Sequence, residues 1–431
     1  MDQAEGQSTY QPLPLFHLEG RSSWGGLLLC IPDGSRPVYH MHMNRWLILA
    51  VLFFARFTMA FQFQSAAALS PFLIEEFSIG LAEIGFLIGL YFAPGIFFAL
   101  PGGVIAARFG DKRIVSLGLL LMLAGGAVTA LTNDWNVLVA GRLILGAGGV
   151  ILNVVMTKML VDWFAGREIS TAMAIFINSW PVGIALALII MPMLALSGGT
   201  AFAWWALWVL VAAGFVLFAL VYRPPETPQT VAATIETVPL PVTALVMASL
   251  VWALYNTALA MIFSFGPALL VQQGWPVTQA GSIISLFMVI FSIALPIGGI
   301  IADRTGRKDA IIHLSLISFA IMMPVVVFVP ASALIVIPIV GLLFAFGGGP
   351  VMTLPGEILS PASRSFGMGV FFTIYYGLMT VGPRIGGGVA DATDDAGAAI
   401  LAGAAMSLIA SVALVLLRRN RHQMPGETPA R

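Results

Sequence analysis

Three arginines lie within long apolar runs of the sequence, where charged side chains are rare. Arg56 falls near the middle of the first run, and Arg142 and Arg384 fall in later ones. A charged side chain in the hydrocarbon core of a membrane costs about 2.5–3.5 kcal/mol on insertion scales, so each one indicates a functional site. A guanidinium stays protonated, and its planar fork binds two oxygens at once, which suits an anionic ligand group. The alternative for Arg56 is a structural contact with backbone carbonyls or with an amide.

Uncharged polar side chains within the apolar runs form a second set of candidates. The predicted ligand-binding residues are Arg56, Gln62, Asn153, Asn178, Asn256, Tyr375 and Arg384. Asn178 lies three residues before Pro181, and a proline inside a helix leaves one backbone carbonyl without its usual donor. The alternative for the asparagines is a hydrogen bond between helices, which contributes about 0.6 kcal/mol.

The elements that position these residues are apolar stretches long enough to cross a membrane, which takes about 20 residues each. Twelve such stretches are predicted, at roughly 45–66, 82–105, 114–132, 137–158, 170–195, 201–222, 241–265, 280–301, 311–329, 333–353, 366–389 and 397–417. We therefore expect an all-α membrane protein of twelve transmembrane helices in two six-helix halves.

The composition agrees with burial in lipid. Hydrophobic residues make up 59% of the chain and charged residues 9%, against roughly 25% charged residues in soluble domains. The net charge is zero, so no general attraction to nucleic acid is expected. Cys30 is the one cysteine, which excludes an intrachain disulfide and a cysteine metal site.

No pattern in the sequence indicates catalysis. The five histidines do not cluster, and no glycine-rich phosphate-binding loop is present. We therefore predict that the protein is not an enzyme and that it uses no metal and no cofactor.

Lysine and arginine are distributed unevenly among the predicted loops. The even-numbered loops and the C-terminal tail carry them, whereas the odd-numbered loops carry acidic residues and none of these bases. Because basic loops stay on the cytoplasmic side, both termini are predicted to be cytoplasmic.

The stretches divide evenly around a polar, proline-rich segment that suits a linker. The predicted parts are a disordered tail at 1–42, a six-helix bundle at 43–222, a cytoplasmic linker at 223–240, a second bundle at 241–417 and a cytoplasmic tail at 418–431.

A repeated motif relates the two bundles. Ala99-Leu100-Pro101 is followed by Gly103, Arg108 and Gly110, and Ala294-Leu295-Pro296 is followed by Gly299, Arg304 and Gly306. Internal repeats of this kind build many transporter folds. The second copy, Gly299-Ile300-Ile301-Ala302-Asp303-Arg304-Thr305-Gly306-Arg307-Lys308, resembles the signature loop of the major facilitator superfamily at every fixed position. The first copy resembles it less, because Ala107 replaces the expected acid.

The resemblance implies a carrier of the bacterial inner membrane with a latch on the cytoplasmic side. In the outward-open state, Arg304 would pair with Glu357 and Arg108 with Asp162. The alternative is that these charges only anchor the topology. The predicted gating residues are Gly103, Arg108, Gly110, Asp162, Arg167, Gly299, Asp303, Arg304, Gly306, Arg307, Glu357 and Arg364.

The resemblance also implies a secondary carrier that works by alternating access. With Arg56, it predicts secondary active or facilitative transport of a small polar or anionic solute by a lipid-embedded monomer. The alternatives are a drug or metabolite efflux carrier and a membrane sensor with the same fold. No Asp or Glu lies clearly at mid-membrane, so we hypothesise that a buried acid does not carry the coupling.

Overall fold

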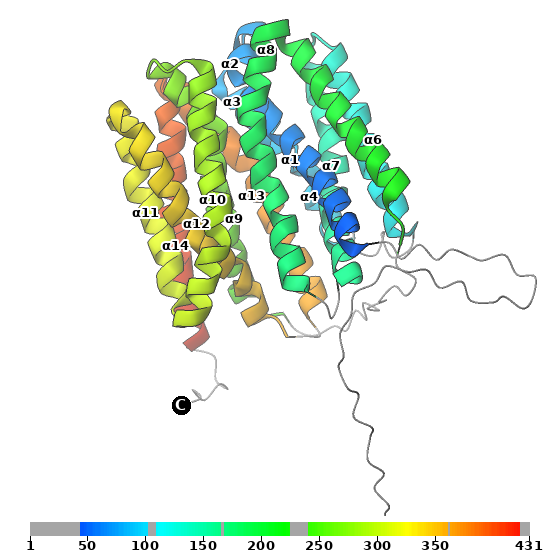
Figure 1. The fold of residues 1–431 in the computed structure, drawn as a ribbon. Helices are drawn as coiled ribbons and strands as arrows, with labels where there is room; N and C mark the ends of the chain where they lie inside the picture. The colour runs from blue at the N-terminus through cyan, green and yellow to red at the C-terminus, as the bar shows by residue number, and fades with distance from the viewer. Residues whose placement is uncertain (1–43, 102–108, 165–167, 225–239, 361–362, 423–431) are drawn as a thin grey trace, which may run out of the picture. The chain divides into compact units, whose positions relative to one another are not determined.

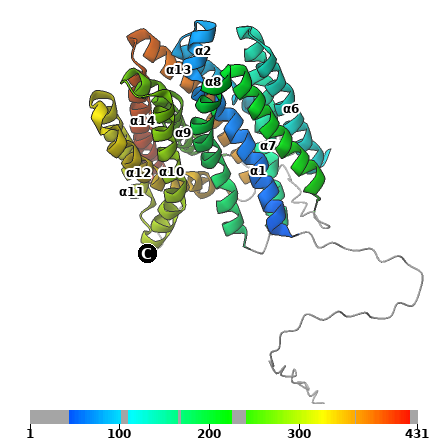
Figure 2. The same cartoon turned by 45° about the horizontal axis from the view of Figure 1, so that its top comes forward.

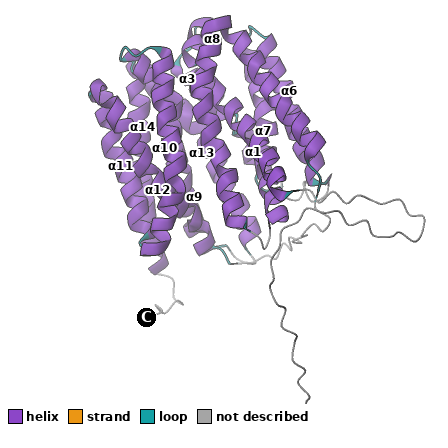
Figure 3. Ribbon diagram, viewed as in Figure 1, coloured by secondary structure: helices purple, strands orange, loops and turns teal. Residues whose placement is uncertain are grey.

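The computed structural model describes residues 44–101, 109–164, 168–224, 240–360 and 363–422. Regular structure in these ranges is helical throughout, and Figure 3 shows no strand among the coloured segments. The predicted tail at 1–42 and most of the predicted linker lie outside the described residues, as do Gly103, Arg108 and Arg167.

The first half begins with α1 and runs to the end of α8. Its helices are α1 (Arg45–Ala68), α2 (Ser70–Phe77), α3 (Leu81–Leu90), α4 (Ala93–Phe98), α6 (Asp111–Leu131), α7 (Trp135–Phe164) and α8 (Ile169–Val221). The predicted stretch 82–105 appears as α3 followed by α4, with turn residues between them. Pro94, in the first turn of α4, accounts for this break because it has no N–H to donate to Leu90.

The second half follows the same plan. Its helices are α9 (Val242–Gln272), α10 (Val277–Thr305), α11 (Lys308–Phe328), the 3₁₀ turn η1 (Pro330–Ser332), α12 (Ala333–Ile358), α13 (Arg364–Thr393) and α14 (Ala396–His422). In Figures 1 and 2, α1 begins and α14 ends at the same end of the helical bundle. We call this the terminal end, and the other the opposite end.

The helix count confirms the prediction of twelve spans. The described residues contain eleven segments that are long and apolar enough to cross a membrane. One of them, Thr171–Val221, has 51 residues and would be about 76 Å long as a straight helix, more than twice the thickness of a bilayer core of about 30 Å. Gly199 interrupts it with a φ of 82° and a ψ of 173°, values that a non-glycine residue rarely adopts. The segment is therefore two spans joined at Gly199, which makes twelve.

The most extensive contacts between the halves run along two helix pairs, and α4 with α13 and α1 with α9 make smaller ones. α8 packs against α10, and α3 packs against α13. The backbones of α3 and α13 lie so close that a Cβ atom at Gly85 would collide with the carbonyl of Pro383. One at Gly89 would collide with the carbonyl of Thr380. Small residues let helix backbones approach in this way in membranes, where packing replaces the hydrophobic effect as the driving force.

Candidate functional site

Arg56 on α1 lies where three helices of the first half meet. Its Nε donates to Oδ1 of Asn153 on α7 at 3.1 Å, and its Nη1 donates to the carbonyls of Phe176 and Ile177 on α8 at 3.0 and 3.2 Å. The guanidinium carbon also lies 4.8 Å from the centre of the Phe176 ring. These contacts fix the orientation of the guanidinium.

The sequence of α8 creates part of this site. In a regular helix the carbonyl of Ile177 would accept from the N–H of residue 181, but Pro181 has none. Arg56 supplies the missing donor. The predicted free carbonyl near Asn178 is therefore present, and it binds an arginine of a neighbouring helix.

Two tyrosines of the second half complete the surroundings of Arg56. Tyr375 and Tyr376 lie on α13, with ring centres 5.0 Å apart. Both lie close enough to Arg56 for an electrostatic interaction, and Tyr376 also interacts with Asn153. We call Arg56, Asn153, Phe176, Tyr375 and Tyr376 the Arg56 site.

One nitrogen of Arg56 is left available. Among the described residues, Nη2 donates none of the hydrogen bonds that the guanidinium forms, which all come from Nε and Nη1. The side chain is only partly buried. The guanidinium is thus held on one side and keeps unused donors on the other.

Arg142 on α7 is different, although it is also an arginine inside a membrane span. Its Nε donates to the carbonyl of Leu87 at 2.9 Å, its Nη1 to that of Gln62 at 3.0 Å and its Nη2 to that of Phe63 at 2.5 Å. The residue is 1% exposed. All three nitrogens are used, so Arg142 is a clamp that joins α7 to α1 and α3.

The other predicted binding residues do not join the Arg56 site. The Gln62 amide donates to the carbonyl of Met122, and the Asn256 amide donates to Trp252 on its own helix. Asn178 accepts from the hydroxyl of Ser292 on α10 at 2.7 Å, which links the two halves. Arg384 is exposed, with its guanidinium carbon 5.1 Å from the centre of the Phe86 ring. The structure therefore brings together Arg56, Asn153 and Tyr375 from the predicted set.

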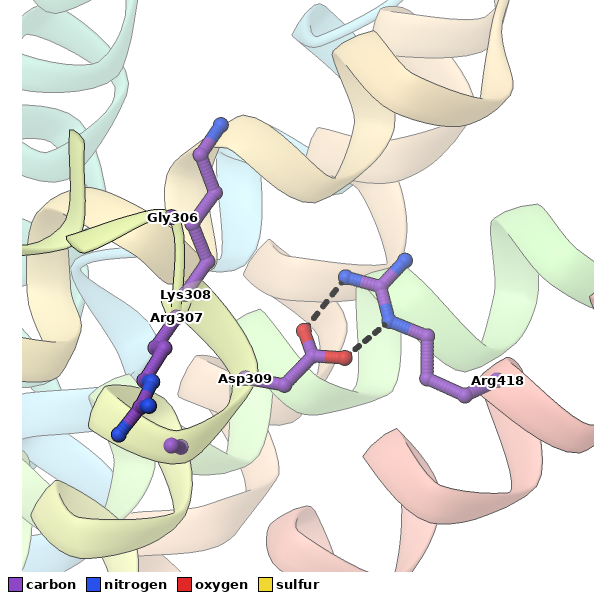
Figure 4. A pocket seen from close by; sticks show the side chains of 6 residues that line it. Gly306, Arg307, Lys308, Asp309 and Arg418 are labelled. Atoms are coloured by element: carbon purple, nitrogen blue, oxygen red, sulfur yellow. Dashed lines mark hydrogen bonds and ion pairs between the residues drawn. The ribbon is translucent and has the colours of Figure 1, made fainter. Parts of the chain in front are cut away.

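At the terminal end, each half has a base that bridges two acids. In the second half, Arg418 binds Asp309 through two nitrogens, with a shortest distance of 2.7 Å (Figure 4), and it binds Glu357 at 2.9 Å. In the first half, Lys158 bridges Asp111 at 2.6 Å and Asp162 at 3.0 Å. Each cluster joins the start of the third membrane span of its half, α6 or α11, to the end of the fourth, α7 or α12.

The latch predicted for the outward-open state stays a prediction, and in this structure its acids have other partners. Among the described residues, Glu357 forms ion pairs with Arg418 and Lys308 and none with Arg304, which is exposed. Arg418, at the end of α14, reaches the carboxylate that Arg304 was expected to bind. The predicted pair of Asp162 with Arg108 involves a residue outside the described ranges, and the described partner of Asp162 is Lys158.

The remaining predicted gating residues have mixed surroundings. Gly306 ends α10 with a φ of 66°, and Gly110 precedes α6 with a φ of 86°, so both turns need glycine. Asp303 and Arg307 are exposed, and Arg364 begins α13. At Gly299 a Cβ would meet nothing within 4 Å, whereas at Gly298 it would collide with the backbone of Phe346. The close approach of α10 to α12 therefore occurs at Gly298.

A contact that the sequence did not predict joins the halves at the opposite end. The carboxylate of Asp391 on α13 accepts from the backbone N–H groups of Leu81 and Ala82, both at 2.7 Å. These groups begin α3, whose preceding residue, Gly80, has no side chain to cap them. An acid is also favoured there by the helix dipole. The missing cap at Gly80 was the only hint in the sequence.

The fold and the site together define a class of protein: a polytopic membrane protein of two helical halves, with a polar cluster where the halves meet. Such clusters between repeated halves are where secondary carriers bind their solutes.

The sequence profile of the Major Facilitator Superfamily matches residues 52–381, and again residues 243–431, so the chain belongs to this superfamily. It is therefore a membrane transporter of solutes that works by alternating access. The second match begins at the start of α9, which agrees with two related halves.

Solved structures share this fold. A crystal structure of the nucleoside transporter NupG, in a mutant form, is 15% identical with a TM-score of 0.67, over 89% of this chain and 100% of that one. A bacterial homologue of the human lysosomal transporter Spinster, in an inward-facing and occupied conformation, is 16% identical with a TM-score of 0.71, over 92% and 100% of the two chains. Among curated proteins, no significant sequence match was found.

Proposed function

We propose that this carrier moves a small anionic solute and that Arg56 binds its negative charge. The observation that carries the proposal is the state of the guanidinium, which Asn153 and two carbonyls of α8 hold in place while Nη2 stays unused. A positioned arginine with free donors is suited to an oxyanion, because a charge-assisted hydrogen bond is roughly twice as strong as a neutral one.

The proposed orientation puts the terminal end in the cytoplasm of a bacterial cell and the protein in the inner membrane, as a monomer without enzymatic activity. The lysines and arginines of the loops support it, since they gather at the ends of the helices that face this side. The division at 223–240 belongs to the same proposal and is supported by the superfamily match that starts at residue 243.

Alternating access then requires the contacts at the opposite end to break. The bonds from Asp391 to the start of α3 close the outer side, and the Arg56 site lies deeper, between α1, α7, α8 and α13. A solute that enters from outside must wait until Asp391 leaves α3. No aspartate or glutamate is among the fully buried residues of the described chain, so we propose that no buried acid carries coupling protons.

Uptake into proteoliposomes tests the proposal. Purified protein is reconstituted and assayed with radiolabelled carboxylates and inorganic anions, a neutral nucleoside and a lipophilic cation. We expect uptake of one class of anion, and we expect Arg56→Gln to lower it by about tenfold or more, as the loss of a charge-assisted bond requires.

Arg384→Gln is the matched control, because it removes an arginine charge outside the Arg56 site. It should transport at close to the wild-type rate. Equal uptake by Arg56→Gln and wild type would overturn the proposal, as would transport restricted to the neutral or cationic probe.

A further inference from the structure

The two tyrosines near Arg56 belong to a larger group of aromatic rings. Tyr375 and Tyr376 come from the second half, and Phe92 of the first half lies 6.2 and 6.1 Å from their ring centres. Trp180 lies 6.5 Å from Phe92, and Trp252 lies 6.1 Å from Tyr375. We call these five residues the aromatic wall. They come from both halves, and Trp180, Trp252 and Tyr375 are partly exposed, so a solute bound between the halves would lie against these three.

The charges near this wall favour a single negative charge. Arg142 is the other arginine in the interior of a described span of the first half, and each of its three nitrogens donates to a carbonyl. Arg384 lies on Phe86, and the described ion pairs of Lys158 and Arg418 belong to the clusters at the terminal end. A second carboxylate on the solute would therefore be desolvated without a cation to pair with, which is costly in a membrane protein.

The hydrogen-bonding capacity of the wall is also small. Its rings supply few polar atoms, and one of them, Nε1 of Trp252, is buried without a partner among the described residues. A solute with many hydroxyl groups would leave most of them unpaired here, whereas an apolar or aromatic body would replace water on the ring faces. One polar group at a distance from the charge could accept from Trp252.

Resting on the proposed function, we infer that the Arg56 site takes amphipathic monoanions: organic acids with one carboxylate and an aromatic or otherwise apolar body. The carboxylate binds Arg56, and the body lies against the aromatic wall. Small inorganic anions, dicarboxylates, sugars and nucleosides fall outside this substrate class.

A series of matched solutes tests the inference on the full-length protein in proteoliposomes. Uptake of labelled benzoate is measured, with unlabelled benzoate, benzamide, acetate and terephthalate as competitors. Benzamide has the ring without the charge, acetate has the charge without the ring, and terephthalate has a second charge. We expect benzoate to compete about tenfold or more better than each of the other three.

Two variants separate the parts of the site. In Tyr375→Leu the advantage of benzoate over acetate should fall several-fold while the advantage of benzoate over benzamide stays. In Arg56→Gln the advantage over benzamide should disappear. Trp205→Leu is the control, because Trp205 packs on Trp208 in the second span of α8, apart from the wall. Thermal stability of each variant shows whether it has folded.

The outcomes distinguish this inference from the proposed function. If acetate, an inorganic anion or a dicarboxylate is transported and benzoate does not compete, the amphipathic class is wrong and anion transport stands. If benzamide competes as well as benzoate, the charge has no role and both proposals fall. Equal competition by benzoate and acetate, unaffected by Tyr375→Leu, removes the aromatic wall from the site.

Discussion

Arg56 and Arg142 both lie inside membrane spans of the first half, and the sequence around them offers little to tell them apart. The structure separates them by the use of their nitrogens. Arg142 donates from all three to carbonyls of Leu87, Gln62 and Phe63 and is 1% exposed. Arg56 donates from two of its three nitrogens and is partly buried beside the tyrosines of α13.

The difference is that a carbonyl engages every nitrogen of Arg142, which serves structure, whereas Nη2 of Arg56 has no described acceptor and is available for binding. Transfer into lipid is costly for both arginines. Arg142 offsets that cost with three carbonyls of its own half. The contacts of Arg56 offset only part of this transfer cost, and a bound anion would offset the remainder.

The largest expected effect is on stability, from Arg142→Met. The substitution removes a charge-assisted hydrogen bond from each of three carbonyls, and such a bond contributes about 1.5–3 kcal/mol. We expect a loss of about 3 kcal/mol or more in the free energy of unfolding, measured by thermal or denaturant unfolding in detergent. The same change at Arg56 should cost about 1 kcal/mol, because its bond to Ile177 is exposed and the carbonyl of Phe176 keeps the Ser179 hydroxyl as a donor. Equal losses at the two positions would break the comparison.

The next effect is on transport, from Asn153→Asp. Asn153 already accepts from Nε of Arg56 at 3.1 Å, so an aspartate of nearly the same shape would place a carboxylate against the guanidinium. The internal carboxylate would neutralise the charge that the solute needs. We expect anion uptake to fall by about tenfold, with stability unchanged or raised, since the new pair is charge-assisted.

Asn153→Leu is the control for that substitution, because it removes the hydrogen bond without adding a charge. It should raise KM by a few-fold and leave some uptake. If Asn153→Asp transports as well as wild type, Arg56 does not bind the anion.

A smaller effect concerns the balance of conformations, from Asp391→Asn. The amide keeps the shape of the carboxylate, but it can accept from α3 through one oxygen only and carries no charge for the helix dipole. The outward-closed state should lose about 1 kcal/mol relative to the outward-open one. In a background that lacks Cys30, a cysteine replacing the buried Ala268 should react several-fold faster with a membrane-impermeant maleimide. An unchanged rate would mean that Asp391 does not hold the outer side closed.

The sequence was sufficient for most of the fold because helix spans are long and their signal is carried by composition. Twelve spans, two halves and the superfamily followed from apolar length and the repeated loop. The break in the second span and the short helix α2 did not, since both depend on local turns.

The site was predictable only where a residue type has few possible roles. Arg56 and Asn153 were selected because polar groups in a span need partners, and Pro181 indicated a free carbonyl. The sequence could not show which carbonyls Arg142 would reach, or that Arg418 rather than Arg304 would bind Glu357. Those outcomes depend on which side chains of distant helices come within about 3 Å of one another.

The smallest effect is expected from Arg384→Gln, which completes the comparison among the three arginines. Arg384 is exposed and its one described contact is the face of the Phe86 ring, an interaction of about 0.5–1 kcal/mol at an exposed position. Glutamine loses that contact but leaves no buried group unpaired. Uptake should stay within about twofold of wild type and stability within about 1 kcal/mol, measured on the same preparations as the other variants. A loss of transport as large as that of Arg56→Gln would show that Arg384, which lies outside the Arg56 site, also contacts the solute. Unused hydrogen-bond donors would then not be the feature that distinguishes Arg56 from the other span arginines.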